Sequence, residues 1–266
     1  MTDIALLLAQ LGDQQKAVQR AAAEGLRDGA QAGLPVREAL LAMLGAPSLR
    51  QRWGASYALG LLGDPPPACL PVLIDVLGAD DGDLRWAASA LLLRMPAAEV
   101  AAALSRLARE GTALQRKMAL YGLRDLGPPV AEATSALSDP DAGVRLAAMA
   151  ALARNPENPE EAAERLAPLL RDPEVGVRRA AAAALGRVGI ATPAAVDALS
   201  VAAAGPDAPL RRAAERALAA VRSRRVAERP YYRPFHTGRR FSTKARCPSR
   251  ASSVRRSGRP ISSWRR

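Results

Sequence analysis

Histidine and cysteine are almost missing from this chain. In 266 residues there is one histidine, His236, and there are two cysteines, Cys69 and Cys247. The absence of histidine from residues 1–221 excludes a Ser-His-Asp triad, a Cys-His pair and a histidine-based metal site in that segment. Two cysteines this far apart give no disulfide framework and no metal spacing, so a reducing cytoplasm is the expected location. There is no Walker loop and no glycine-rich dinucleotide turn, so the sequence supports neither a cofactor nor an enzymatic activity.

Aromatic residues and long apolar runs are also scarce. Aromatics make up 3% of the chain, whereas hydrophobic residues make up 49% and are mostly alanine and leucine. This composition suits a thin, layered core. No stretch of about 18 apolar residues escapes interruption by charge or proline, so we expect no membrane span. An acid stands in Met1-Thr2-Asp3 where a signal peptide would carry a base, so we expect no export signal.

The net charge of +12 is unevenly distributed. Residues 222–266 hold 15 Lys and Arg and one acid, Glu228, which gives +14. Residues 1–221 hold the other 23 basic residues and 25 acids, which gives −2. Any electrostatic attraction to nucleic acid or to an acidic membrane is therefore expected from the tail.

One motif recurs seven times and is clearest from Val177 to Gly186. Successive copies are 33, 33, 31, 29, 33 and 33 residues apart. The position after the valine is occupied by Gln19, Arg52, Arg85, Arg116, Arg145, Arg178 and Arg211. A period of this length is typical of a solenoid, in which each unit buries its apolar face against its neighbours.

The spacing of small residues within the motif predicts a helix. Counting from Val177 as zero, offset +8 is leucine in all seven copies, and offsets +3, +4 and +7 are Ala or Gly in 19 of 21 cases. These offsets share one helical face, and a second apolar helix precedes each copy. The sequence thus predicts an all-α, right-handed α-solenoid of about seven helical hairpins over residues 1–222. A disordered, Arg- and Ser-rich tail is expected over residues 223–266.

The clearest copies resemble a known repeat family. The pattern Asp-Pro-x-x-x-Val-Arg-x-x-Ala-Ala-x-Ala-Leu-Gly is complete from Asp172 to Gly186 and nearly complete from Asp139 to Leu152. It is similar to the HEAT-like repeat named after phycobilisome lyases, and the resemblance covers residues 1 to about 222. Such repeats occur in bilin lyases, hydroxylases and many scaffolds, so the resemblance implies a fold more than a function.

In such repeats the arginine of the motif pairs with acids in the inter-helix loops and forms a structural ladder. The ladder positions are Arg52, Arg85, Arg116, Arg145, Arg178 and Arg211. The implied pairs join Arg145 and Arg178 to Asp139 or Asp172. Copies two and four lack the loop aspartate, so Arg52 and Arg116 are either structural like the others or available for binding. Gln19 departs from the pattern, as expected of a terminal repeat.

Aromatic residues occupy two offsets opposite the small-residue face. Trp53 and Trp86 are at offset +2, and Tyr57 and Tyr121 are at offset +6, one helical turn away. By the resemblance, this side of the second helix lines the concave surface. We expect a partner-binding patch made of Trp53, Tyr57, Trp86 and Tyr121, flanked by Lys117, Arg124 and Leu93. Alternatively, the rings fill gaps left by Gly54, Gly60 and Gly122.

Three functions follow from these features. The first is a non-enzymatic scaffold that binds a protein partner on its concave face. The second is a bilin-lyase-like factor that holds a tetrapyrrole and its acceptor protein. The third is nucleic-acid binding, either through the tail or as in HEAT-like DNA glycosylases, but a body charge of −2 argues against a basic groove. The tail itself is a nucleic-acid arm, a docking segment for an acidic partner, or a run-on end without function. The oligomeric state is left open.

Overall fold

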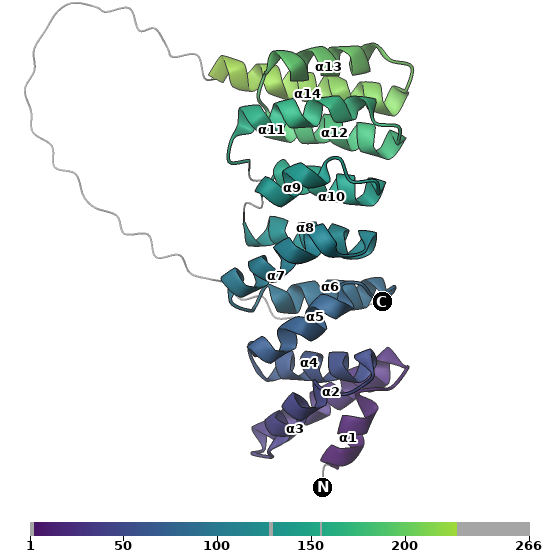
Figure 1. Cartoon of the computed structure of the whole chain (residues 1–266), viewed down its shortest axis with the longest axis vertical. Coiled ribbons are helices and arrows are strands. Elements are labelled where there is room, and N and C mark those ends of the chain that lie inside the picture. The colour runs from purple at the N-terminus through teal and green to yellow at the C-terminus, as the bar shows by residue number, and fades with distance from the viewer. Residues whose placement is uncertain (1–2, 128–129, 155, 228–266) are drawn as a thin grey trace, which may run out of the picture. The chain divides into compact units, whose positions relative to one another are not determined.

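A computed structural model describes residues 3–127, 130–154 and 156–227. These residues lie in one compact unit, Met1–Arg229. The described part of the chain contains fourteen α-helices, two short 3-10 helices and no strand (Figure 1). The all-α fold is therefore confirmed. Helix α14 continues past Arg222 to Ala227, and the tail expected beyond it lies outside the described residues from 228 onward.

The helices alternate between the two members of seven hairpins. The first helices are α1 (Ile4–Gln10), α3 (Val36–Met43), α5 (Leu70–Val76), α7 (Ala97–Glu110), α9 (Val130–Ala136), α11 (Pro159–Leu166) and α13 (Pro193–Ala204). The second helices are α2 (Lys16–Gln31), α4 (Leu49–Leu62), α6 (Gly82–Leu92), α8 (Ala113–Leu126), α10 (Ala142–Leu152), α12 (Val175–Val188) and α14 (Ala208–Ala227). The 3-10 helices are η1 (Pro67–Cys69) before α5 and η2 (Ala167–Arg171) after α11.

Polar side chains in the short loops start the second helices. Asp81 accepts hydrogen bonds from two backbone N–H groups at the start of α6, and Asp141 accepts one from Val144 in α10. Thr112 and Gln115 form a reciprocal capping box at the start of α8. Each cap satisfies backbone donors that have no partner within the helix. Asp81 and Asp141 thus fix where α6 and α10 begin, and Thr112 does the same for α8.

The repeated leucines form the centre of the core. All seven leucines at offset +8 are buried: Leu26, Leu59, Leu92, Leu123, Leu152, Leu185 and Leu218. The alanines at offset +4 are at most 1% exposed in every copy: Ala22, Ala55, Ala88, Ala119, Ala148, Ala181 and Ala214. The predicted face is therefore confirmed as buried at offsets +4 and +8, whereas most residues at offset +3 are half-buried and Ala21 is exposed.

Small residues in this face allow backbones to approach closely. A Cβ added to Gly54 would lie 2.4 Å from the carbonyl oxygen of Leu11, at the end of α1. At offset +9, outside this face, a Cβ added to Gly186 would lie 3.2 Å from the Cα of Ala217 in α14. A larger residue at either position would push neighbouring hairpins apart.

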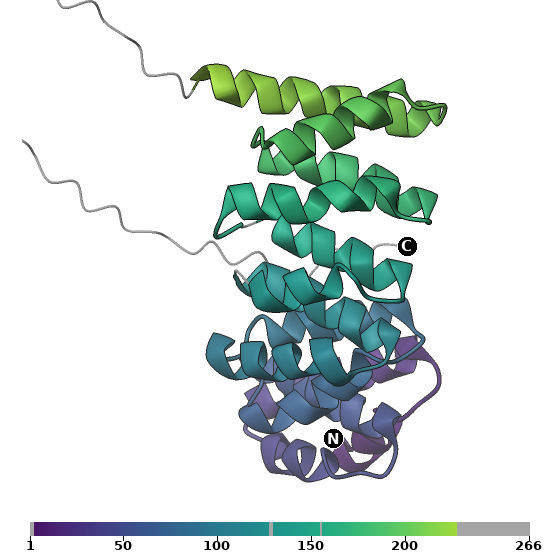
Figure 2. The ribbon, with the colours of Figure 1, turned by 45° about the horizontal axis from the view of Figure 1, so that its top comes forward.

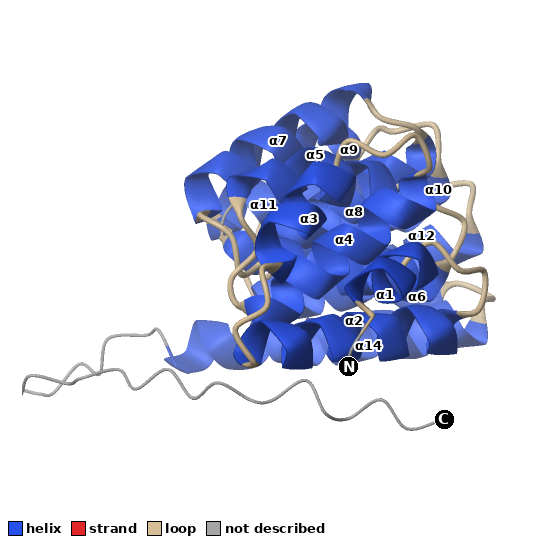
Figure 3. Cartoon of the chain, turned by 90° about the horizontal axis from the view of Figure 1, so that it is seen from below, coloured by secondary structure: helices blue, strands red, loops and turns tan. Residues whose placement is uncertain are grey.

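The hairpins stack into two layers. Second helices contact one another, as in α2 with α4, α8 with α10 and α12 with α14, and first helices do the same, as in α5 with α7. Figure 2 shows the chain-order succession of the hairpins, and Figure 3 shows α5, α7 and α9 on one side and α6, α12 and α14 on the other. The side of the second helices that faces away from the first helices is called the outer face below. It comprises the residues at offsets +2, +6 and +9.

Candidate functional site

All six ladder arginines make the same kind of hydrogen bond, from the side chain to a backbone carbonyl oxygen. Each donates from Nη1 to a backbone carbonyl oxygen five or six residues earlier, in the turn after the first helix of its own repeat. The acceptors for Arg52, Arg85, Arg116, Arg145, Arg178 and Arg211 are Ala46, Ala79, Gly111, Asp139, Asp172 and Gly205. A cation near carbonyls at a helix C-terminus is favourable, because those oxygens lack partners within the helix. The bond therefore closes each hairpin from within.

Gln19 provides the same bond in the first repeat. Its Nε2 donates to the carbonyl oxygen of Leu11 at a distance of 2.9 Å, and the side chain is buried. Leu11 is the C-terminal cap of α1, so the acceptor is again the end of the first helix. The first repeat therefore has the same side-chain-to-backbone hydrogen bond as the others, made by an uncharged side chain.

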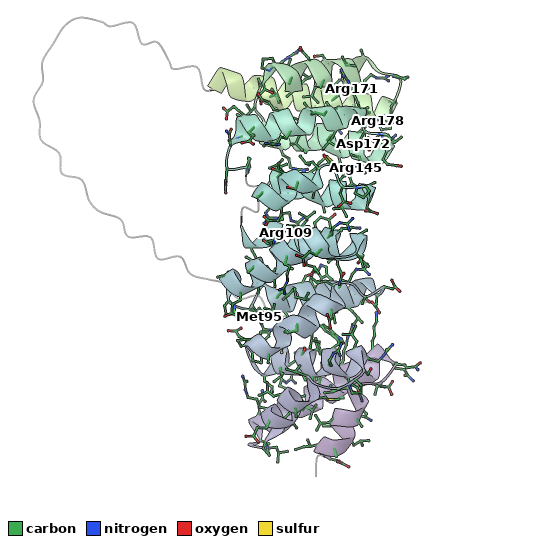
Figure 4. All side chains as sticks on the ribbon, viewed as in Figure 1. Met95, Arg109, Arg145, Arg171, Asp172 and Arg178 are labelled. Carbon is green, nitrogen blue, oxygen red and sulfur yellow. The ribbon has the colours of Figure 1, made fainter. Side chains whose placement is uncertain are left out.

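Three of the arginines also reach an aspartate of the next repeat. Arg145 binds Asp172 through two bonds of 2.8 Å, from Nε to Oδ2 and from Nη2 to Oδ1 (Figure 4). Arg116 binds Asp139 in the same way, at 2.7 and 2.8 Å. Such paired bonds fix both side chains in one plane.

The third pair corrects the expectation that two arginines are available for binding. Arg52 reaches Asp75 through one contact of 3.3 Å, and Arg116 is paired as above. Of the implied pairs, Arg145 with Asp172 is present, and for Arg52 and Arg116 the structural alternative describes the structure, with carboxylates that come from the following repeat. Arg178 binds the backbone oxygens of Asp172 and Pro173, not a carboxylate.

Burial and pairing act in opposite directions on the two ladder aspartates. Burial raises the pKa of Asp172, but hydrogen bonds from Arg145 and from the Glu174 backbone N–H outweigh it, so the pKa lies below its ordinary value. For Asp139, burial likewise raises the pKa, and the hydrogen bonds from Arg116 and the backbone bring it below the ordinary value. Both carboxylates are charged at neutral pH.

An ion pair joins two hairpins that are not sequence neighbours. Lys16, at the start of α2, lies 2.7 Å from Asp81 and 2.9 Å from Asp83, at the start of α6. Helix α4 contacts both α2 and α6. Adjacent packed helices lie about 8–10 Å apart, so this contact needs α2 and α6 to converge over the start of α4. Nothing in the spacing of the motif predicts this pair.

Trp53 is buried, with 5% of its surface exposed, which corrects the expectation that it lies open on a binding patch. It is near the start of α4, where the Lys16 pair draws α2 and α6 together. Its ring centroid is 5.8 Å from that of the half-buried Tyr57. The side chains next to Gly54, Gly60 and Gly122 are those of Leu11, Leu91 and Leu104, so Trp53 is buried without filling the gaps at these glycines.

The other aromatic positions are more accessible. Trp86 is 61% exposed on α6, and Leu93 directly after that helix is 44% exposed. On α8, the Arg124 guanidinium lies 5.1 Å from the ring centroid of the half-buried Tyr121. Lys117 is half-buried one turn before Tyr121. These five residues come from two consecutive second helices and the turn after one of them.

The four aromatic residues named above are all the aromatic residues of 1–221. None is at an offset of the small-residue face, although an aromatic ring would bury more apolar area than alanine. Of these four rings, Trp53 belongs to the buried core, Tyr57 and Tyr121 pack against it, and Trp86 is exposed. Within the described residues, no group of His, Cys, Asp and Glu is arranged to hold a metal ion. No described helix is both long enough and apolar enough to cross a membrane.

Comparisons with known proteins agree with this architecture. No curated protein is significantly similar to the chain in sequence. Among solved structures, Escherichia coli YibA is similar with a TM-score of 0.52 and 14% identity, over 83% of this chain and 92% of that one. An archaeal HEAT-like repeat protein from Thermococcus onnurineus NA1 is similar with a TM-score of 0.51 and 13% identity, over 83% and 97%. The sequence profile of the HEAT repeats matches residues 4–94 and 130–219, more than half of the chain. The chain therefore belongs to the HEAT repeat family.

Proposed function

We propose that this protein is a non-enzymatic HEAT-repeat scaffold that binds a protein partner on the outer face, centred on α6 and α8. The observation that carries the proposal is the placement of Trp86, 61% exposed, on the face to which all aromatic residues of 1–221 are confined. Exposed tryptophan, tyrosine and arginine are the residues that most often dominate protein interfaces. Leu93, Tyr121 and Arg124 supply that combination beside it.

The ladder arginines stabilise the fold, whereas Trp86 is on the proposed binding surface, and this difference supports the proposed role. The ladder arginines are engaged in closing and joining hairpins, as shown by their bonds to backbone carbonyls and aspartates. Trp86 belongs to neither the ladder nor the buried core. A change at Trp86 is therefore expected to alter binding with little effect on folding.

The curvature of the first three repeats also favours this face. The Lys16–Asp81 pair lies on the outer-face side and draws α2 and α6 together across α4. A layer whose non-adjacent helices converge is on the inner side of a bend, so we infer that the outer face is concave here. A concave face surrounds a bound segment more completely than a flat one does.

We also infer that the repeats are of the phycobilisome-lyase HEAT-like type, because the motif is complete from Asp172 to Gly186. This inference concerns the repeat and not the ligand. No feature of the described residues favours a bilin over a polypeptide.

The experiment compares two single variants of the full chain. Trp86→Ala removes the proposed anchor, and Val201→Ala on α13 is the matched control, because Val201 is also 61% exposed. Partners captured from a lysate by the natural chain are purified and titrated against both variants. Trp86→Ala should weaken binding by about 1–3 kcal/mol, with a stability loss under about 1 kcal/mol. Val201→Ala should change neither quantity.

A contrary result is equally clear. If Trp86→Ala lowers the thermal midpoint by several degrees and leaves the affinity unchanged, Trp86 serves packing and the proposal is wrong. If it changes neither, the partner binds elsewhere.

A further inference from the structure

The near-neutral body hides a segregation of charge. Residues 1–221 hold 23 basic and 25 acidic residues, which gives −2. The outer-face offsets of the seven second helices nevertheless hold seven basic residues and one acid, Glu24, a local charge of +6. The basic residues are Arg20, Arg27, Lys117, Arg124, Arg179, Arg212 and Arg216. Three of them form ion pairs with Asp28, Asp125 and Asp207, which leaves a local charge of +3 against −5 for the rest of residues 1–221, so the outer face is basic against an acidic remainder.

The chemical character of the outer face changes along the stack. Its middle, on α6, α8 and α10, combines apolar and aromatic residues with Lys117 and Arg124 of α8. There Trp86 and Leu93 are exposed and Tyr121 and Leu146 are half-buried. Its C-terminal part, on α12 and α14, is basic and exposed. The residues there are Arg179, Arg212 and Arg216, with only the small side chain of Ala183 between them.

The C-terminal arginines differ in how far they are neutralised. Arg179 lies 3.2 Å from Asp207. Arg212 and Arg216 are exposed and make no hydrogen bond or ion pair with other residues in the described part of the chain. Their charge is therefore available to a ligand carboxylate at no cost in existing contacts.

We propose that the outer face binds an acidic polypeptide segment with one aromatic or aliphatic anchor. The anchor lies on the apolar middle beside Trp86, and the carboxylates lie on Arg179, Arg212 and Arg216. This proposal rests on the proposed function and adds to it the chemistry and the direction of the partner. The positive charge of the outer face favours an acidic ligand, and the apolar residues in its middle favour a ligand that carries an apolar anchor residue.

The arrangement suits a polypeptide better than a nucleic acid. Acids lie among the basic residues of the face, as in the pairs Arg27–Asp28, Arg124–Asp125 and Arg179–Asp207. A duplex presents one phosphate charge about every 1.7 Å, so its backbone would meet these carboxylates as well as the arginines. A polypeptide places its few carboxylates at separate positions and avoids them.

The spacing of helices sets the spacing of the ligand's features. Stacked helices lie about 8–10 Å apart, and an extended peptide advances about 3.3 Å per residue. Each second helix therefore corresponds to about three ligand residues. Three steps separate α6, which carries Trp86, from α12, so acidic residues should begin about seven to nine positions from the anchor.

The test selects ligands for the full chain from displayed random peptides of about twelve residues, long enough at about 3.3 Å per residue to reach from α6 to α12. Selected peptides are then titrated against two triple variants. One carries Arg179→Gln, Arg212→Gln and Arg216→Gln. The control carries Arg37→Gln, Arg106→Gln and Arg171→Gln, which remove three exposed arginines from the first-helix side. Both variants keep the basic tail, so any attraction by the tail is equal in the two.

The expected peptides carry an aromatic residue or leucine and a group of Asp or Glu about seven to nine positions away. Their affinity should fall at least about fivefold in the outer-face variant and less than about twofold in the control. Selection of peptides without acid enrichment overturns the proposal. Equal binding by both variants also overturns it, because the tail is then the binder. Tighter binding of a labelled DNA oligonucleotide that is lost in the outer-face variant overturns it in favour of nucleic acid.

Trp86→Ala separates this proposal from the proposed function. If selected peptides depend on Trp86 but show no acid preference, the scaffold function stands and the acidic ligand is wrong. If they depend on neither Trp86 nor the three arginines, both proposals are wrong.

Discussion

The junctions between repeats are built differently in the two halves of the solenoid. In the C-terminal half, Arg116–Asp139 and Arg145–Asp172 join successive repeats through paired, largely buried bonds. In the N-terminal half, the corresponding contact is the single 3.3 Å contact of Arg52 with Asp75, whose side chain is 55% exposed. In that half, the buried ring of Trp53 and the ion pair of Lys16 with Asp81 provide the other contacts that hold the repeats together. The bond from arginine to the carbonyl of its own repeat is thus the constant requirement, and the carboxylate partner varies.

The largest expected effect comes from breaking a C-terminal junction. Asp172→Ala leaves the Arg145 guanidinium buried without its carboxylate, because Arg145 is only 9% exposed. The free energy of unfolding should fall by about 3–5 kcal/mol. Asp75→Ala is the matched N-terminal change and should cost less than about 1 kcal/mol. Chemical denaturation of both variants measures the difference. Equal losses would show that the two halves are joined alike.

The second prediction compares two tryptophans at the same offset. Trp53→Ala removes a buried ring and should lower the free energy of unfolding by about 3 kcal/mol or more. Trp86→Ala, at the exposed equivalent position in the next repeat, should lower it by less than about 1 kcal/mol. Thermal and denaturant unfolding of the two variants test the contrast. A larger loss for Trp86 would reverse the assignment of core and surface.

The third prediction concerns acid. The pKa values of Asp139 and Asp172 are lowered in the folded protein, so these groups stabilise it above their unfolded pKa of about 3.9. That contribution is lost as the pH falls from about 4 through the lower folded values. Unfolding measured between pH 6 and pH 2 should therefore show a steep loss in the natural chain. The loss should be shallower in Asp172→Ala, which no longer has the group to protonate. An identical pH profile would exclude the pair as its source.

The smallest effect is expected at the Lys16 pair. Lys16→Gln removes the link between α2 and α6 at an exposed site, where salt screens the interaction. The stability loss should be slight and should vanish in high salt, whereas the loss in Asp172→Ala should persist. Urea unfolding at low and high salt makes the comparison. A large, salt-independent loss would mean that this pair is as important as the C-terminal junctions.

Features that repeat in every copy could be predicted from the sequence, and features that arise between copies could not. The leucines at offset +8 and the alanines at offset +4 follow from helical periodicity alone, and all are buried. Trp53 and Trp86 share an offset, yet only the first is buried, in the part of the stack where Lys16 reaches Asp81 across 65 residues of sequence. The acid partner of Arg116 was missed because the side chain reaches into the following repeat.

The bond from each arginine to a carbonyl of its own repeat has a consequence for how such a chain changes length. Because donor and acceptor are at most six residues apart, a duplicated or deleted repeat keeps the bond intact. Only the contact between an arginine and the aspartate of the neighbouring repeat can be disrupted by such a change. Arg85 makes its backbone bond without any such aspartate contact in the described part of the chain. Gene duplication can therefore add or remove whole units with a penalty confined to one junction. In the first repeat described, Gln19 keeps this bond with an uncharged side chain.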